Sequence, residues 1–181
     1  MKYEKTLELK NGKTLLIRNG TEADGSEMFE LFMRTHAETD NLLSYPEENS
    51  LNAEQEAEFL KSKTESENEI ELAAVVDGKI VGMAGFEAIG SKYKVKHRAE
   101  FGITVAEANW GMGIGRALTR ACIECARAAG YAQLELSVVG DNSKAMALYE
   151  SEGFTVFGRN PKGFNSKFTG WQELVEMRLE L

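Results

Sequence analysis

Hydrophobic and polar residues alternate along residues 99–105, and this alternation predicts a β-strand with one apolar face. Between residues 114 and 129, small or apolar residues recur every three or four positions, which predicts an amphipathic helix. Residues 133–138 alternate again and predict a second strand. Because the order is strand, helix, strand, we expect the two strands to be parallel and joined by a right-handed crossover.

Two dipeptides predict β-hairpins in the N-terminal half of the chain. Asn11-Gly12 separates two strand-like runs within residues 6–18, and Asp77-Gly78 does the same within residues 69–87. Asn-Gly and Asp-Gly favour the type I′ turn, whose two central residues both have positive φ.

The remaining patterns complete the expected fold. Residues 21–66 contain two helical patterns separated by a loop at residues 41–52. Residues 154–157 and 174–179 predict two final strands, paired antiparallel across a loop at residues 158–170. We therefore expect an α/β (α+β) fold with a mixed, mostly antiparallel, twisted sheet of about seven strands. It should contain one central parallel pair and carry helices on both faces, in a single domain over residues 1–181.

Composition narrows the possible functions only in part. The chain has 181 residues, of which 43% are hydrophobic and 28% charged, as is usual for a soluble globular domain. No apolar run is long enough to span a membrane, and the first five residues lack the apolar region of a signal peptide, so we expect a cytoplasmic protein. The net charge of −8 argues against a nucleic-acid partner and weakly favours an amine-bearing one.

Cys122 and Cys125 form a C-x-x-C pattern that raises the question of a redox or metal site. A reactive pair gains from lying at a helix N-terminus, where the thiolate is stabilised. These two cysteines instead fall well inside the predicted helix, on its apolar face. We therefore interpret them as structural residues and predict no metal site.

Three glycines in five positions connect the strand at residues 99–105 with the following helix. A glycine-rich turn before a helix lets an anion approach free backbone N–H groups, and the helix dipole favours negative charge there. The dinucleotide fingerprint G-x-G-x-x-G fails because Arg116 stands at its last glycine, and the P-loop pattern ending at Thr14 fails because Leu7 replaces its first glycine. A phosphate or pyrophosphate site remains, beside the alternative of a glycine-rich turn without a ligand.

Two sequence blocks together resemble one protein family. Trp110-Gly111-Met112-Gly113-Ile114-Gly115 is similar to the acetyl-coenzyme A pyrophosphate loop of the GNAT acetyltransferase superfamily, written Q/R-x-x-G-x-G/A, with Trp110 in place of Gln or Arg. Residues 142–154 resemble the family segment N-x-x-A-x-x-L-Y-x-x-x-G-F. The resemblance covers residues 69–181 well and the N-terminal third loosely.

The resemblance implies acetyl-coenzyme A as cosubstrate, bound by a core over residues 69–157, and an acceptor pocket lined by the helices within residues 21–66. In the family, the pantetheine arm pairs with the backbone of the first parallel strand, which here means Ile103, Thr104 and Val105. The pyrophosphate meets the loop and the helix start, which here means Trp110, Gly111, Met112, Gly113, Ile114, Gly115 and Arg116.

Further residues have both a cofactor interpretation and a structural one. Asn142 matches the asparagine that binds the cofactor arm and equally suits a helix N-cap. Arg116, Arg120 and Lys144 are candidates for the adenosine phosphates, and the alternative is that they are ordinary exposed cations.

Acetyl transfer from a thioester to an amine needs a base for the amine proton and an acid for the departing thiolate. Glu100 matches a family carboxylate that takes the proton directly or through water, and the alternative is a structural carboxylate. Backbone N–H near Val105 would polarise the carbonyl as an oxyanion hole does. Tyr149 matches the family tyrosine proposed to protonate the thiolate, and the alternative is a core tyrosine.

The function implied is an N-acetyltransferase that moves acetyl to a primary amine by direct attack, with a small molecule or polyamine favoured as acceptor. The alternatives are N-terminal or lysine acetylation of a peptide or protein, and a non-catalytic acyl-coenzyme A-binding module. A cleft narrowed by the loop at residues 41–52 would favour a small molecule, and an open groove a peptide. We expect a monomer or homodimer.

Overall fold

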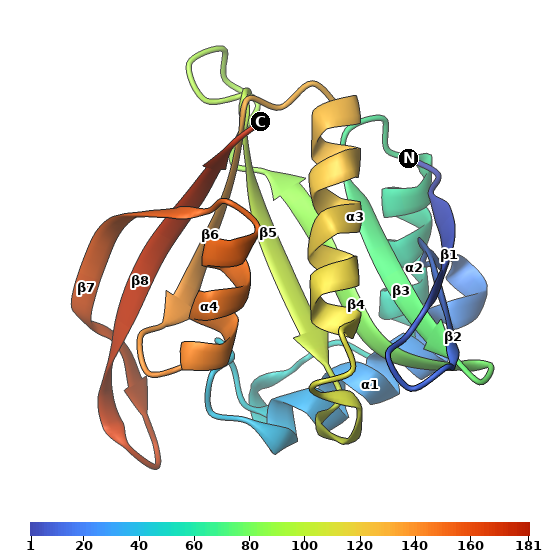
Figure 1. Ribbon diagram of the computed structural model, residues 1–181, viewed down its shortest axis with the longest axis horizontal. Coiled ribbons are helices and arrows are strands. Elements are labelled where there is room, and N and C mark those ends of the chain that lie inside the picture. The colour runs from blue at the N-terminus through green and yellow to red at the C-terminus, as the bar shows by residue number, and fades with distance from the viewer.

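The computed structural model describes all residues from Met1 to Leu181 and contains one eight-stranded sheet in the order β1-β2-β3-β4-β5-β6-β8-β7 (Figure 1). Only β5 and β6 are parallel, and all other neighbouring strands are antiparallel. The predicted fold class is confirmed, with eight strands where about seven were expected. The strands are β1 Glu4–Glu8, β2 Thr14–Asn19, β3 Ile70–Val76, β4 Lys79–Ala88, β5 Arg98–Val105, β6 Gln133–Val139, β7 Thr155–Ser166 and β8 Gly170–Glu180.

Helices cover both faces of the sheet, with α3 and α4 in front and α1 and α2 behind in Figure 1. Their bounds are α1 Gly25–Glu38, α2 Ala53–Glu65, α3 Ile114–Ala128 and α4 Ser143–Ser151. The apolar stripe of α3, which includes Leu118, is buried in the main core. A smaller core on the opposite face joins α1 and α2 to the sheet through Met28, Leu31 and Leu60. No helix combines the length and the apolar composition needed to cross a membrane.

The two cysteines lie within the main core as free thiols. Burial raises the pKa of Cys125 to about 11 and that of Cys122 well above its usual range. Both side chains therefore remain protonated at neutral pH and pack as small hydrophobic groups. This agrees with their interpretation as structural residues.

The parallel pair is short. Arg98–Glu100 of β5 pairs with Gln133–Glu135 of β6, and the two strands then separate. Beyond this point β5 stays paired with β4 on its other side, up to Val105. The edge of β5 that faces β6 is consequently free of strand partners over residues 103–105.

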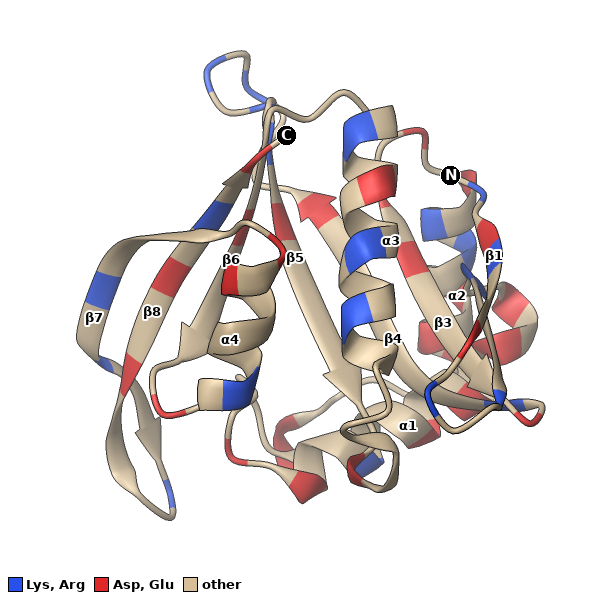
Figure 2. Ribbon diagram, viewed as in Figure 1, with Lys and Arg blue, Asp and Glu red and all other residues tan.

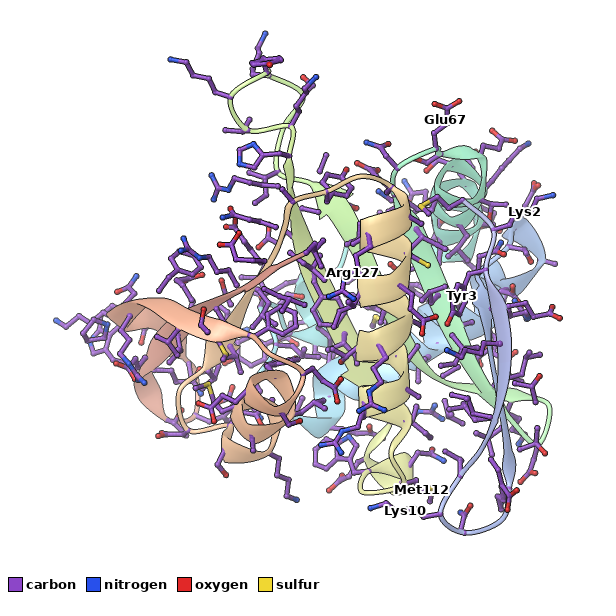
Figure 3. The ribbon with its side chains drawn as sticks, turned by 45° about the horizontal axis from the view of Figure 1, so that its top comes forward. Lys2, Tyr3, Lys10, Glu67, Met112 and Arg127 are labelled. Atoms are coloured by element: carbon purple, nitrogen blue, oxygen red, sulfur yellow. The ribbon has the colours of Figure 1, made fainter.

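The first hairpin departs from the expected turn. At Asp77-Gly78 both residues have positive φ, 52° and 77°, as the type I′ turn requires. At Asn11-Gly12 only Gly12 does, so the type I′ prediction for that dipeptide is wrong. The turn is longer, with Leu9 N–H donating to the Lys13 carbonyl and Gly12 N–H donating to the Leu9 carbonyl. It places Lys10 beside Met112 (Figure 3).

The C-terminal hairpin is longer than expected. The predicted loop at residues 158–170 is mostly strand, since β7 continues to Ser166 and β8 begins at Gly170. The register with β8 shifts near Gly158 and again after Asn160. Pro161 lies within the second register shift. Both shifts interrupt the alternation of apolar and polar residues that predicts a strand.

Acidic residues lie on each of the three central strands β4, β5 and β6 (Figure 2). Glu87 of β4, Glu100 of β5 and Glu135 of β6 are register neighbours, so their side chains share one face. Lys63 pairs with Glu87 at 2.9 Å, and Arg98 pairs with Glu135. Glu100 makes neither an ion pair nor a hydrogen bond, and so it is the one carboxylate of the three without a partner.

Candidate active site

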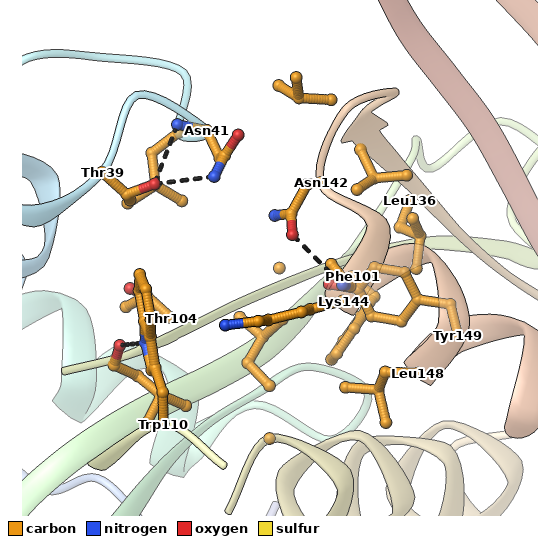
Figure 4. A pocket seen from close by; sticks show the side chains of 18 of the residues that line it. Thr39, Asn41, Phe101, Thr104, Trp110, Leu136, Asn142, Lys144, Leu148 and Tyr149 are labelled. Carbon is orange, nitrogen blue, oxygen red and sulfur yellow. Dashed lines mark hydrogen bonds between the residues drawn. The ribbon is translucent and has the colours of Figure 1, made fainter. Parts of the chain in front are cut away.

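The separation of β5 and β6 opens a cavity of about 1110 Å³ (Figure 4). Its walls come from β5, β6, the start of α3, the start of α4, the segment that follows α1, and the β7–β8 hairpin. Cavities at the carboxyl ends of parallel strands are usual ligand sites in α/β sheets. The lining includes these predicted site residues: Glu100, Ile103, Thr104, Val105, Trp110, Gly111, Gly113, Ile114, Gly115, Arg116, Asn142, Lys144 and Tyr149.

The glycine loop exposes a run of backbone donors. The N–H groups of residues 111–116 donate to no other backbone atom. Gly111 and Gly113 have φ of 78° and 95°, a conformation that favours glycine, and Gly113 is the N-cap of α3. The loop thus aims several free N–H groups, together with the positive end of a helix, at one region of the cavity. This arrangement suits a pyrophosphate.

Met112 is the member of this loop that does not line the cavity. Its sulfur accepts weak hydrogen bonds from Asn11 Nδ2 at 3.8 Å and Asn109 Nδ2 at 4.0 Å. The first hairpin therefore holds the Met112 side chain. The same hairpin also contributes Lys10 to the cavity lining. Sequence reasoning missed Lys10, because no local pattern joins it to a loop about a hundred residues away.

Trp110 occupies the position where the family pattern has Gln or Arg. Its indole N–H donates to the Val105 carbonyl at 2.6 Å, which ties the loop to the end of β5. The Lys144 ammonium from α4 lies 5.9 Å from the centre of the Trp110 ring. Figure 4 shows this lysine extending toward Trp110. The cation–π contact joins the two walls of the cavity.

Two of the three arginines of α3 have a structural partner. Arg116 and Arg120 both pair with Glu152 at the end of α4, at 3.2 and 2.8 Å. Arg120 does not line the cavity, whereas Arg116 does. Lys144 has no carboxylate partner and is the more available of the predicted cations.

Asn142 fulfils its structural role and retains capacity for a ligand. Its side-chain oxygen accepts from Ala145 N–H at 3.2 Å, which makes it the N-cap of α4. Its amide NH₂ group has no protein partner, and the residue lines the cavity. Both interpretations of Asn142 are therefore compatible with the geometry.

Tyr149 is a buried tyrosine with a hydroxyl that has no hydrogen-bond partner in the protein. Its ring packs edge-on against Phe101, with centroids 6.2 Å apart, and at a tilt against Phe154. Burial raises the pKa of the phenol above its ordinary value. The hydroxyl therefore stays protonated throughout the neutral range and can donate a proton or a hydrogen bond into the cavity.

Glu100 lies at the other side of the same cavity as an exposed side chain. It belongs to the sheet face that α1 and α2 cover, together with Gly102 and Thr104. Other residues of the cavity lining come from segments far apart in sequence: Thr39, Asn41, Leu42, Leu43, Ser137, Val139, Phe164 and Leu174. The last two were missed because their strands were read as a loop or only in part.

Comparison with known proteins identifies the family. The sequence profile of the acetyltransferase (GNAT) family matches residues 26–154, which is most of the chain. The chain belongs to the GNAT family. The prediction made from the glycine loop and from residues 142–154 is thereby confirmed.

Individual relatives are more distant. The L-methionine sulfoximine/L-methionine sulfone acetyltransferase of Salmonella typhimurium is 30% identical over 110 residues, covering 61% of this chain and 64% of that enzyme. This GNAT chain thus spans slightly less than two thirds of that relative's length.

Solved structures share the fold over nearly the whole chain. A GNAT acetyltransferase from Streptococcus pneumoniae superposes with a TM-score of 0.88 at 28% identity, covering 92% of this chain and 99% of that one. YncA of Salmonella typhimurium, a putative acetyltransferase with its cofactor acetyl-CoA, superposes at 0.82 with 23% identity, covering 92% and 94%.

The glycine loop gives a first prediction. We expect Gly113→Ala to weaken acetyl-coenzyme A binding about tenfold or more, since the added methyl would stand among the free N–H groups. Gly130→Ala is the matched control, because Gly130 ends the same helix with φ of 83° and also has open space around an added Cβ. Both variants should lose about 1–2 kcal/mol of stability from left-handed backbone strain.

Calorimetry with acetyl-coenzyme A and thermal unfolding would measure the two effects separately. Equal affinity in the wild type and in Gly113→Ala would show that the ligand does not approach this loop. A parallel loss of affinity in Gly130→Ala would show that the effect is one of stability alone.

Proposed function

We propose that this GNAT protein transfers an acetyl group from acetyl-coenzyme A to the amino group of a small molecule. The observation that carries the proposal is one cavity lined by the free N–H groups of the glycine loop and by Glu100 and Tyr149, neither of which has a hydrogen-bond partner in the protein. The named relative and the neighbour solved with acetyl-CoA support it.

The residues present fit this cosubstrate. The N–H groups of residues 111–116 would hold the pyrophosphate, and Lys144 and Lys10 would add positive charge near the phosphates. The edge of β5 that faces β6, at residues 103–105, would pair with the amides of the pantetheine arm through the backbone groups that Trp110 does not occupy. When bound, acetyl-coenzyme A supplies the reactive thioester.

Glu100 would remove the proton from the acceptor amine, directly or through water, because it lines the cavity and no cation competes for it. A free backbone N–H on the β6-facing edge of β5 would polarise the thioester carbonyl. Tyr149 would give its phenolic proton to the departing thiolate. No covalent intermediate on the protein is needed, since the amine attacks the thioester itself.

Hydrogen bonds join two segments that line the cavity, the one after α1 and the β7–β8 hairpin, and this favours a small acceptor over a peptide. Asp40, just after α1, accepts hydrogen bonds from Ser166 at 2.6 Å, Tyr45 at 3.1 Å and Thr169 at 3.1 Å. Gln172 of β8 donates to the same carboxylate at 3.2 Å. The segment that follows α1 is therefore tied to the β7–β8 hairpin across the cavity.

A panel of small primary amines and a lysine-containing peptide would test this function in the wild type and in Asp40→Ala. We expect the wild type to acetylate small amines and to leave the peptide unmodified. In Asp40→Ala the KM for small amines should rise about tenfold, because the three hydrogen bonds from Ser166, Thr169 and Gln172 that hold the segment to the hairpin are lost. The KM for acetyl-coenzyme A should not change.

Lys167→Met is the control, because it removes the exposed ion pair with Glu47 and the cation–π contact with the Tyr45 ring but leaves the hydrogen bonds of Asp40 in place. Rapid acetylation of the peptide by the wild type would favour a peptide or protein acceptor. Tight binding of acetyl-coenzyme A without turnover on any amine would favour a non-catalytic binding module.

A further inference from the structure

A carboxylate that the proposed mechanism does not use lies next to the acceptor cavity. Glu71 of β3, Gly85 of β4 and Gly102 of β5 are register neighbours, so they form one row across the sheet. The row lies on the same face as Glu100, two residues farther along β5. Gly102 lines the cavity.

The two glycines leave room above this row. A Cβ on Gly85 would lie 2.1 Å from Glu71 Oε2, so the carboxyl group of Glu71 occupies the space over Gly85. A Cβ on Gly102 would meet nothing within 4 Å. Opposed Cβ positions in neighbouring strands are about 5 Å apart, so the carboxyl group borders the open space over Gly102.

No cation near Glu71 is free to form an ion pair with its carboxyl group. Its carboxyl makes no hydrogen bond or ion pair, and the charged groups near enough to act on it are Glu56 and Lys63 of α2 and Glu87 of β4. Lys63 is already engaged by Glu69 at 2.7 Å and by Glu87. Burial, and then the charge of Glu56, raise the pKa of Glu71 to about 8.

We propose that Glu71 binds a second ammonium group of the acceptor, so that the substrate is a short diamine and not an amino acid. An ammonium group over Gly102 would contact Glu71, while the reacting amine lies near Glu100, about 7 Å farther along the strand. A carboxylate at the same place would gain no such contact with Glu71, and the charge of Glu100 would repel it. The inference rests on the proposed acetyltransferase function.

Three acceptors that share a chain of four carbon atoms test the inference: diaminobutane, butylamine and 4-aminobutyrate. They differ only in whether the far end is cationic, apolar or anionic. We expect the KM to be lowest for diaminobutane and highest for 4-aminobutyrate. In Glu71→Gln the KM for diaminobutane should rise about tenfold to a hundredfold, as for loss of one charge-assisted hydrogen bond, with butylamine little affected.

Glu58→Gln, an exposed change on α2, is the charge-matched control. Gly102→Ala supplies a second variant, since its Cβ meets no atom and its φ is not positive, so the fold should tolerate it. It should raise the KM for diaminobutane by filling the open space, without the charge change. Thermal unfolding would check that all variants fold.

Calorimetry adds a readout that is independent of turnover. An ammonium beside Glu71 favours its ionised form, so diaminobutane binding to the complex with coenzyme A should release a proton near pH 7. Buffers of different ionisation enthalpy report that proton, and Glu71→Gln should abolish it.

Equal KM values for diaminobutane and butylamine, or an unchanged preference in Glu71→Gln, would overturn the inference and leave the acetyltransferase function intact. If no amine is acetylated, the proposed function fails. In that case the binding experiment still decides whether Glu71 holds an ammonium group.

Discussion

Replacing Glu100 with Gln should lower kcat/KM for the amine by about 10²- to 10⁴-fold, the usual contribution of general base catalysis. Gln keeps the size of the side chain and removes its ability to take a proton. Because Glu100 is exposed and has no hydrogen-bond partner, the change should leave the fold intact. The dissociation constant of acetyl-coenzyme A should stay the same, since the pyrophosphate would be held elsewhere.

The pH dependence of Glu100→Gln gives the sharper test. As the pH rises, more of the amine loses its proton in solution and needs no base, so the deficit of the variant should shrink. Glu150→Gln, an exposed change on α4, is the control. An unchanged profile in Glu100→Gln would mean that the amine arrives neutral or that another group takes its proton.

Replacing Tyr149 with Phe should lower kcat by about 10²-fold, toward the lower end for general acid catalysis, because coenzyme A is already a tolerable leaving group. The change removes only the hydroxyl, which bonds no protein atom, so the packing of the ring on Phe101 and Phe154 should survive. An acid that acts as the carbon–sulfur bond breaks stabilises the transition state more than the bound substrate. The effect should therefore appear in kcat, while acetyl-coenzyme A affinity changes by less than about 1 kcal/mol.

Tyr131→Phe is the matched control. Tyr131 is equally buried, and its hydroxyl accepts a hydrogen bond from Asn68 outside the cavity. Stopped-flow or steady-state kcat and calorimetric affinity would be compared in both variants. Full activity of Tyr149→Phe would remove the residue from the mechanism, and a large affinity loss with normal kcat would make it a binding residue.

Local sequence patterns determined the centre of this fold. The alternation of β5, the stripe of α3 and the glycines between them are set by neighbours in the chain, because side-chain periodicity and backbone freedom are local properties. Asn142 as the N-cap of α4 and the turn at Asp77-Gly78 were readable for the same reason. The turn at Asn11-Gly12 and the long β7 were not, since the turn length and the register with β8 override local preference.

Tertiary structure alone decided which side chains share the cavity. Glu152 pairs with Arg116 and Arg120 because α4 packs beside α3, and Lys10 reaches the cavity because the first hairpin lies against Met112. Likewise, only strand register places Glu71 beside Gly102, through Gly85. The sequence by itself determined the family, the loop that suits a phosphate and the two catalytic candidates. The partners of its charged groups depend on contacts between segments far apart in the chain, and no local pattern encodes them.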